Sequence, residues 1–387
     1  MNRTRLGAAA AVARHQPREA PPPVLGTDAT VPRHLVHKRA VEHVFVTDVR
    51  MVDGHPAASA QLPRLHSFYN DTPAPYYDLL LVGEAARQCV EAMAHRLLDV
   101  PDDTAFIMHD MTVELLDPAA FRIGAAPTDL VVRGEVPADR QRHPGDGRAT
   151  HATDGTAGCW IGGRRVARFA GAVTFVSAHG YAQLRGQSAA AAVRLAAPPA
   201  EPLGAAHGGD RADTPAGRQR ADGQRGDGQR GGRQRADAAR AGRRDPGNVV
   251  IAPPEIDLSG RATTRLTLDA DHPVFFEHRQ DHYPAMALLE ACRQTALAAG
   301  LATTGRPAHQ LLATRCRAHF DAYAELGADV LCHAEPGSAA RGGGLTVPVR
   351  ATQAGRPVMA AELTFTAPGG DSSDSTVSLA PGRGGSV

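Results

Sequence analysis

A short motif that occurs twice constrains the fold of this chain more than any other feature. Glu-Ala-x-Arg-Gln begins at Glu84 and again at Glu290, and a histidine, His66 or His272, lies 18 positions before each copy. Chance rarely produces a five-residue motif with a histidine at the same upstream spacing in both copies. The 387-residue chain is therefore predicted to contain two copies of one structural unit.

Both copies have the same order of predicted elements. The motif lies on a helix predicted over 78–98 in the first half and over 285–302 in the second. β-Branched and alternating segments predict strands over 41–49, 105–116, 128–136, 164–177, 262–268, 310–321, 328–335, 345–352 and 357–366. Because several consecutive strands follow one long helix in each half, the sequence predicts an α+β fold with an antiparallel sheet, present in tandem.

Composition predicts where the two folded segments begin and end. Residues 186–247 contain few large apolar side chains and carry 11 arginines against six aspartates and one glutamate. Such a segment buries too little apolar surface to offset its conformational entropy, so it is predicted to be a disordered Arg/Gly/Asp-rich linker. The two folded repeats are expected at 31–185 and 248–368. The flanking residues 1–30 and 369–387 are expected to be loose termini.

Charge and hydropathy argue against several classes of protein. The net charge is +1 and aromatic residues make up 4% of the chain, which disfavours a general nucleic-acid-binding protein. RNA binding by the arginine-rich linker is the alternative, but its interspersed aspartates favour a plain linker. No apolar run approaches the roughly 18–20 residues of a membrane span, and the N-terminus lacks the apolar stretch of a signal peptide. We therefore expect a cytoplasmic protein without a membrane partner.

The helix of the first half has an ordinary amphipathic pattern. Polar residues recur at steps of three and four positions and form one continuous stripe: Glu84, Arg87, Gln88, Glu91 and His95. Glu84 and Arg87 are therefore expected mainly as a solvated ion pair, with a catalytic role as the alternative.

The helix of the second half is apolar nearly all round beyond one polar patch. That patch contains Glu290, Arg293 and Gln294, and the following segment "ALAAGLA" carries no charge. Burying an ionised glutamate and arginine is costly unless each is paired and hydrogen-bonded. A functional role is therefore favoured for Glu290 and Arg293, with a buried structural ion pair as the alternative.

Histidines near the two helices are further candidates. His272 and His282 lie upstream of the second helix, and the repeat makes His66 equivalent to His272. The segment "DHPVFFEHRQDH" contains metal-ligand types, but it lacks the His-Glu-x-x-His spacing, so no metal is expected.

Two segments of the sequence resemble a known family. At "HSFYNDTPAPYYDLLLVGEAARQ" and "DHYPAMALLEACRQ" the sequence is similar to the A-factor biosynthesis family of actinomycetes, the γ-butyrolactone autoinducer synthases, which are double hotdog proteins. The resemblance extends to "VHKRAVEHVFVTDV" and "HPVFFEH" and so covers both repeats. It implies a tandem hotdog, in which a long helix is wrapped by an antiparallel sheet in each unit. The two units would form one pseudo-dimer, either as a monomer or within a homodimer.

The resemblance also implies an activity. Members of this family transfer a β-ketoacyl group from acyl carrier protein to the hydroxyl group of dihydroxyacetone phosphate, on the way to a butenolide and a butyrolactone signal. The phosphopantetheine of the carrier delivers the acyl group, so no further cofactor is expected. A hotdog thioesterase, a hotdog dehydratase and a non-enzymatic acyl-ligand-binding protein are the alternatives.

The candidate residues suit attack of an alcohol on a thioester, which needs a base for the hydroxyl proton and donors for the developing oxyanion. Glu290 is expected to act as the base or to orient the substrate, while Arg293 binds the phosphate or keeps Glu290 ionised. The expected catalytic set is Glu290, Arg293, His272, Glu84 and Arg87, and the expected substrate-binding set is His66, His282, Gln294 and Gln88.

Overall fold

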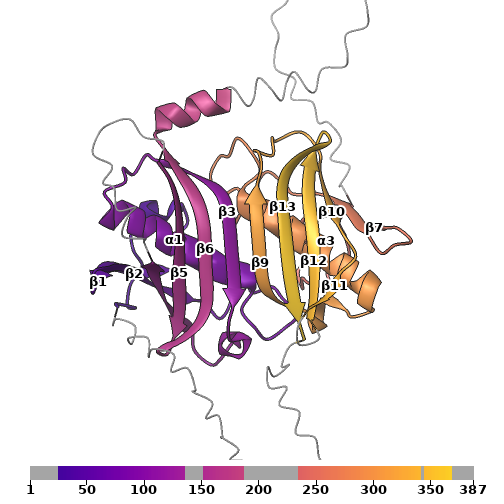
Figure 1. Ribbon diagram of the computed structural model, residues 1–387, viewed down its shortest axis with the longest axis horizontal. Coiled ribbons are helices and arrows are strands. Elements are labelled where there is room, and N and C mark those ends of the chain that lie inside the picture. The colour runs from indigo at the N-terminus through magenta and orange to yellow at the C-terminus, as the bar shows by residue number, and fades with distance from the viewer. Residues whose placement is uncertain (1–24, 136–150, 187–233, 341–343, 368–387) are drawn as a thin grey trace, which may run out of the picture.

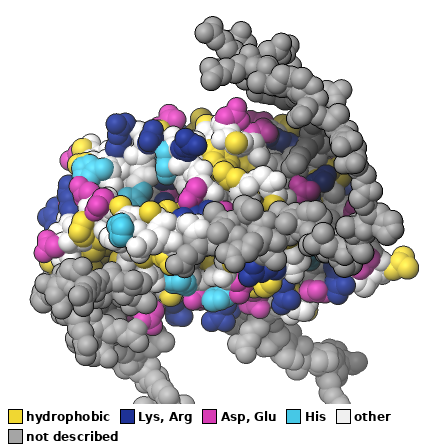
Figure 2. Space-filling view, turned by 90° about the horizontal axis from the view of Figure 1, so that it is seen from above, with side chains coloured by type: hydrophobic (Ala, Val, Ile, Leu, Met, Phe, Trp, Pro, Cys, Tyr) yellow, Lys and Arg dark blue, Asp and Glu magenta, His cyan; other side chains and the backbone are white. Residues whose placement is uncertain are grey.

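One antiparallel sheet curves round two long helices (Figure 1) in the computed structural model, which describes residues 25–135, 151–186, 234–340 and 344–367. The strand order is β1-β2-β4-β5-β6-β3-β9-β13-β12-β10-β8-β7, and β11 pairs with β12. Basic and acidic side chains are interspersed on the face shown in Figure 2. None of the helices within the described ranges is both long and apolar enough to cross a membrane.

The elements fall into two successive sets along the sequence. The first set is β1 (Val46–Val52), β2 (His55–Leu62), α1 (Leu79–Leu97), β3 (Ala105–Leu115), β4 (Thr128–Glu135), β5 (His151–Ile161) and β6 (Arg164–Val176). The second set is β7 (Glu255–Ile256), β8 (Ala262–Arg265), α3 (Ala285–Thr304), β9 (Leu312–Phe320), β10 (Val330–Ala334), β11 (Ser338–Ala340), β12 (Gly344–Gln353) and β13 (Arg356–Thr366). Each set therefore contains one long helix and its antiparallel strands, which confirms the predicted tandem α+β fold.

The differences from the predicted elements are a short helix over 178–186 that the sequence does not predict, and several strands. The helices predicted over 78–98 and 285–302 are α1 and α3. The sequence does not predict β2, "HPAASAQL", or β5, "HATDGTAGCWI", because alanine and glycine have low strand propensity. Pairing with neighbouring strands, rather than local preference, forms these two elements.

The two halves join along β3 and β9. These strands pair antiparallel from Asp110 with His319 to Glu114 with Arg315, which makes the sheet continuous. Helix α1 packs on β1 and β2, α3 packs on β10 and β12, and the two helices also touch each other. Both helices lie behind the strands in the view of Figure 1. They share one side of the sheet, so residues of one half can contribute to a site in the other.

The second repeat begins earlier than the sequence predicts. Residues 234–247, assigned above to the linker, are packed against the folded unit. The Ala236 N–H donates to Ile251 O over 2.8 Å, just as the Val31 N–H donates to Val46 O over 3.0 Å in the first half. Ala236 lies 205 positions after Val31, and Ile251 lies 205 positions after Val46. The predicted linker is therefore wrong at its C-terminal end.

A buried arginine explains why composition misses this segment. Arg243 is 2% exposed, and it donates through Nε to Glu290 Oε1 over 2.9 Å and through Nη1 to Phe68 O over 2.6 Å. Ion pairing and hydrogen bonding hold the segment, whereas composition reports apolar burial. The rest of the predicted linker, 187–233, lies outside the described residues, as do residues 1–24 and the predicted loose C-terminus 369–387. The predicted loose N-terminus ends too late, because Leu25 is buried and the Gly26 N–H donates to Asp48 Oδ2 over 2.9 Å.

Replacing Arg243 by Ala should destabilise the protein by about 3–5 kcal/mol, because Glu290 would keep a buried charge with one cationic partner fewer. Arg244→Ala is the matched control, since Arg244 is exposed and, among the described residues, its side chain donates only to Pro73 O, at 3.4 Å. Denaturant unfolding followed by circular dichroism measures both variants. Equal free energies of unfolding for the two would show that Arg243 does not hold 234–247 in the folded unit.

Candidate active site

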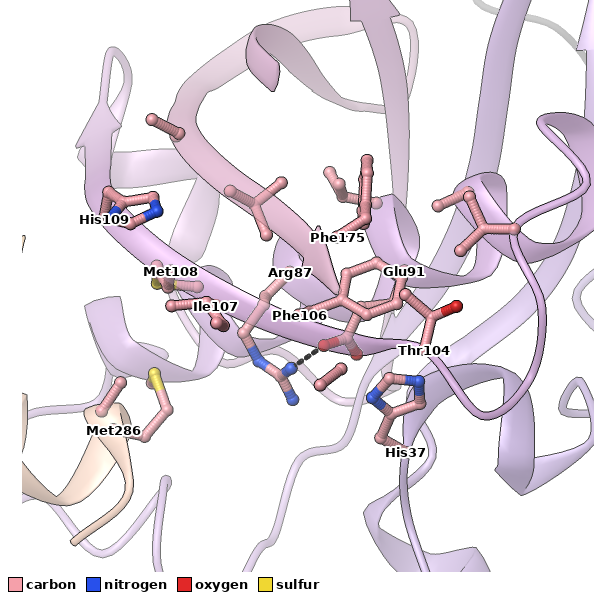
Figure 3. Close-up of a pocket in the computed structure, with 18 of the residues that line it drawn as sticks. His37, Arg87, Glu91, Thr104, Phe106, Ile107, Met108, His109, Phe175 and Met286 are labelled. Atoms are coloured by element: carbon pink, nitrogen blue, oxygen red, sulfur yellow. Dashed lines mark hydrogen bonds and ion pairs between the residues drawn. The ribbon is translucent and has the colours of Figure 1, made fainter. Parts of the chain in front are cut away.

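A cavity of about 1760 Å³ lies between the two halves, beside the later turns of α1 (Figure 3). Its lining comes from α1, β3, β5 and β6, and from residues between 274 and 288 and between 320 and 324 of the second half. Its apolar wall includes Val90, Met93, Phe106, Phe169, Phe175 and Met286. Its polar wall, the charged row, includes His37, Lys38, Glu84, Arg87, Glu91 and Glu277. The cavity therefore joins an apolar recess to a row of ionisable groups.

Glu84 and Arg87 form the centre of the charged row. Arg87 donates through Nε to Glu84 Oε2 over 2.9 Å and through Nη2 to Glu84 Oε1 over 2.8 Å, and its Nη1 pairs with Glu91 Oε1. Lys38 Nζ lies 3.1 Å from Glu84 Oε1, and the Glu84 side chain is 1% exposed. The expectation of a solvated ion pair is therefore wrong. The sheet wraps α1, so its polar stripe meets the cavity and a neighbouring loop instead of water.

The second half supplies one end of the charged row. Glu277 Oε1 lies 3.4 Å from Lys38 Nζ, and Glu277 Oε2 lies 3.0 Å from His43 Nδ1. Burial opposes ionisation of Glu277, but the His43 hydrogen bond and the Lys38 charge hold its pKa at about 2. Neither half alone contains the complete row.

Two carboxyl groups of α1 release their protons at very different pH. Burial raises the pKa of Glu84, but the charges of Arg87 and Lys38 outweigh burial and hold that pKa well below its usual range. For Glu91, burial outweighs the attraction of Arg87, and the Glu84 charge adds to it, so its pKa rises to about 7. Glu84 is therefore ionised at neutral pH, whereas Glu91 exchanges a proton there.

The glutamines of the repeated motif are buried and hold the motif to the segment that precedes each sheet. Gln88 accepts from one backbone N–H of residues 43–45, and it donates to one backbone carbonyl oxygen there and to Glu84, each over 2.9 Å. Gln294 makes the equivalent bonds with residues 248–250 and with the glutamate of its own motif. Both side chains position other groups and lie away from the cavity lining.

Glu290 lies away from the large cavity, unlike its counterpart Glu84, although both side chains are almost completely buried. It is 0% exposed and accepts from Arg293 Nε over 2.8 Å, from Arg293 Nη2 over 2.7 Å and from Arg243 Nε over 2.9 Å. Burial raises the pKa of Glu290, but the charges of Arg243 and Arg293 outweigh burial and lower that pKa. Arg243 stands 205 positions after Lys38 and takes its place. Neither Glu290 nor Arg293 lines the large cavity.

A second cavity at the equivalent place in the other half is nearly filled, with a volume of about 30 Å³. Leu297 lines it, 206 positions after Glu91, and Gly242 lines it, 205 positions after His37. A Cβ atom on Gly242 would lie 2.7 Å from Leu297 Cδ1, so the space is already occupied. An aliphatic side chain and a glycine thus replace two ionisable groups, and the cavity beside α1 is the open one of this pair.

The paired histidines His66 and His272 cap equivalent turns. Nδ1 of His66 accepts from the N–H groups two and three residues later, both over 3.1 Å, and Nδ1 of His272 accepts from the equivalent groups over 3.3 and 3.4 Å. Burial is the main cause that lowers both pKa values to about 4, so both rings are neutral. Neither histidine lines the large cavity.

His282 does line the cavity, at the edge formed by the second half. Its Nδ1 lies 2.6 Å from Asp281 Oδ1. Asp281 also accepts from Arg185 Nε over 2.8 Å, and Arg185 donates to both oxygens of Glu325 over 2.8 and 2.7 Å. Arg185 belongs to a helix over 178–186, so this ion-pair cluster fastens the end of the first half to the second half beside the cavity.

The sequence singles out only part of the charged row. His37, Lys38 and Glu277 lie in segments that share the family resemblance, but they are not among the predicted site residues. The sequence predicts Glu91 only as one member of a polar stripe. One signal for Lys38 exists, because it is the only lysine among the 42 basic residues of the protein. Among the residues that the structure describes, no three His, Cys, Asp or Glu side chains gather as a metal-ion site.

Comparison with known proteins gives matches to both repeats. A family model, the A-factor biosynthesis hotdog domain, matches residues 20–176 and 227–368. A protein of Streptomyces virginiae named 2-oxo-3-(phosphooxy)propyl 3-oxoalkanoate synthase is 31% identical over 326 residues, which cover 84% of this chain and 94% of that protein. A protein of the same name from Streptomyces coelicolor is 29% identical over 279 residues, or 70% of this chain and 72% of that protein. A solved hot dog protein from Alicyclobacillus acidocaldarius aligns with a TM-score of 0.43 and 11% identity, over 83% of this chain and 95% of that one.

The free energy of unfolding of the wild-type protein should fall as the pH rises, and the Glu91→Gln variant should lack this fall. Because the folded pKa of Glu91 is about 7 and its ordinary value is 4.5, the folded state binds more protons between these values. The wild-type free energy of unfolding should therefore fall across this range, by up to about 3 kcal/mol from this group. Urea unfolding at pH 5 and pH 8 measures the effect.

Glu255→Gln is the control for this measurement, since Glu255 is exposed on a short strand. The difference between wild type and the Glu255 variant should stay constant between the two pH values. If the free energies of unfolding of wild type and the Glu91 variant instead changed equally between the two pH values, Glu91 would titrate normally.

Proposed function

The chain belongs to the A-factor biosynthesis hotdog family, and we propose that it transfers a β-ketoacyl group from an acyl carrier protein to the hydroxyl group of dihydroxyacetone phosphate. As an acyltransferase it joins the alcohol oxygen to the thioester carbon, breaks the C–S bond and returns the proton to the released thiol. The product is a 2-oxo-3-(phosphooxy)propyl 3-oxoalkanoate, the compound in the names of its relatives. This ester precedes a butenolide and a γ-butyrolactone signal.

The open cavity is the observation that carries the proposal. Its volume of about 1760 Å³ exceeds the roughly 300–1,000 Å³ of ordinary ligand pockets. Two substrates must meet in this reaction, and one of them carries a pantetheine arm and an acyl group. The apolar wall around Phe106 and Phe175 suits the acyl group, and the charged row suits the triose phosphate.

Arg87 and Lys38 are the groups that we assign to the substrate phosphate. Arg87 presents a planar guanidinium, which binds phosphate oxygens in pairs. Its Nη1 pairs with Glu91, whose pKa of about 7 allows protonation to free this donor for the phosphate. Glu84 holds the two cations in place and does not react, because Arg87, Lys38 and Gln88 already occupy its oxygens.

The proposal places catalysis in the first half, although the sequence favours Glu290 and Arg293. Those two side chains make a sealed ion pair, and His66 and His272 cap turns. The second half contributes Glu277 and one wall of the cavity. Because one copy of the protein builds the whole site, we assign the reaction to a single copy, and its steps use only side chains of that copy. We place it in the cytoplasm, together with the carrier protein.

The deciding experiment incubates the full-length protein with β-ketoacyl carrier protein and dihydroxyacetone phosphate, followed by mass analysis. An ester that requires the triose phosphate supports the proposal. Free β-keto acid formed without the acceptor would indicate a thioesterase, and an enoyl product from a β-hydroxyacyl carrier would indicate a dehydratase. Bound acyl ligand without turnover would indicate a ligand-binding protein.

Glu84→Gln and Glu290→Gln should separate the catalytic half from the supporting half. The Glu84 variant should lose at least about 100-fold in kcat, because an amide holds Arg87 and Lys38 less firmly at the substrate. The Glu290 variant should lose about 3–5 kcal/mol of stability yet keep kcat within about threefold of wild type when folded. Steady-state ester formation and thermal unfolding measure the two effects. The opposite pattern would place catalysis in the second half.

A further inference from the structure

His37 lies at the cavity wall in a backbone conformation that few residues adopt. Its φ is 51° and its ψ is 38°, in the left-handed region that favours glycine. The equivalent residue of the second half is Gly242, with a φ of 73°. The first half thus keeps a strained His37 beside its open cavity. The second half has a glycine, which adopts this conformation without strain, beside its filled cavity. Strain retained at a cavity is a reason to look for function there.

The hydrogen bonds of His37 fix which ring nitrogen carries its proton. His95 Nδ1 lies 2.9 Å from Val100 O, and a carbonyl only accepts, so this nitrogen of His95 is the donor. In the neutral ring Nε2 of His95 is then an acceptor. It lies 2.9 Å from His37 Nε2, which must be the donor. Nδ1 of His37 therefore carries the lone pair, and it makes no hydrogen bond to any described residue; the ring is half-buried and lines the cavity.

We propose that His37 is the general base of the acyl transfer and that His95 is a positioning residue that keeps its Nδ1 unprotonated. This inference rests on the proposed function and names the group that removes the proton in it. Nδ1 of His37 takes the proton from the hydroxyl group of dihydroxyacetone phosphate while the oxygen attacks the thioester carbon. The C–S bond then breaks, and the imidazolium returns the proton to the thiolate of the carrier.

Glu91 suits this role less well, although it stands beside His37 in Figure 3. Its Oε1 pairs with Arg87, and its Oε2 is buried and makes no hydrogen bond to any described residue. A substrate hydroxyl could reach that oxygen only after the wall had moved. The ring of His37 is partly exposed, so a substrate can contact it directly.

The charges that face His37 make its basicity depend on the bound substrate. Burial first, and then the charge of Arg87, lower the pKa of His37 to about 4. The groups that lower this pKa or lie beside the ring are Arg87, His95, His278, Lys38 and Glu91. The free enzyme therefore keeps the ring neutral. A phosphate dianion bound to Arg87 and Lys38 offsets two of the positive charges, so it strengthens the base when the acceptor is in place.

His37→Gly tests the proposal with little risk to folding, because glycine occupies the equivalent position in the second half. In the ester assay, kcat of this variant should fall roughly 10²–10⁴-fold, while KM for dihydroxyacetone phosphate changes little. Added imidazole should restore part of kcat, in proportion to the free base, because it can enter the space that the ring has left. His37→Asn, which also tolerates this backbone conformation, should lose kcat to a similar extent.

Two further variants complete the test. His34→Asn is the control, since His34 lies on the same segment and its side chain is 58% exposed; it should retain wild-type kcat. His95→Asn can place its amide N–H group at the position of Nδ1, as the donor for Val100 O, but it has no atom at the position of Nε2 to accept from His37. The kcat should therefore fall at least about 10-fold with KM unchanged. Unaltered kcat in the Asn variant of His95 would overturn its positioning role.

A wild-type-like kcat in His37→Gly, or a loss of kcat that imidazole does not relieve, would overturn the role of His37. Thermal unfolding of each variant shows that the comparison is made on folded protein. If the wild-type protein itself forms no ester, the proposed function fails and this inference fails with it. Wild-type turnover together with an unaffected His37→Gly variant would overturn the inference alone.

Discussion

Each unit depends on one buried carboxylate of its central helix. Glu84 and Glu290 accept from the arginine and the glutamine of their own motif, and each pairs with a second cation, Lys38 or Arg243, from the segment before its sheet. A carboxylate without these partners would be costly to bury. The contact therefore fixes the rotation of the helix and ties the entering segment to it. The cavity exists because this arrangement sets a polar stripe of α1 under the sheet.

A few side chains decide what the same scaffold does in each half. Where the first half has His37 and Glu91, the second has Gly242 and Leu297, and the space between helix and sheet closes. The second unit contributes Glu277 and one wall to the cavity beside α1 of the first unit. Duplication permits this division, because one copy can keep strained and partly paired groups while the other contributes stability.

The tandem α+β architecture follows from the sequence because apolar periodicity and a repeated motif are local signals. The strands β2 and β5 do not, since their alanines and glycines acquire strand geometry only through pairing. Amphipathicity separates the polar face of α1 from its apolar face, but it does not tell whether that polar face meets water or a cavity. The sequence therefore favours a functional role for Glu290, whereas our proposal places the functional site at Glu84. The equivalence of Lys38 and Arg243 is hard to detect in the sequence for two reasons. The two motifs lie 206 positions apart, whereas Lys38 and Arg243 lie 205 positions apart, and Arg243 stands in an arginine-rich segment.

The seam between β3 and β9 bears on how the molecule is made. As the protein leaves the ribosome, the first half emerges with β3 as an open edge, because its partner β9 lies some 200 residues further on. An open edge invites pairing with a neighbouring molecule. Glu277 and the wall around residues 320–324 are also absent at that moment. The first half alone thus has an open sheet edge and an incomplete cavity wall, and the second half completes both.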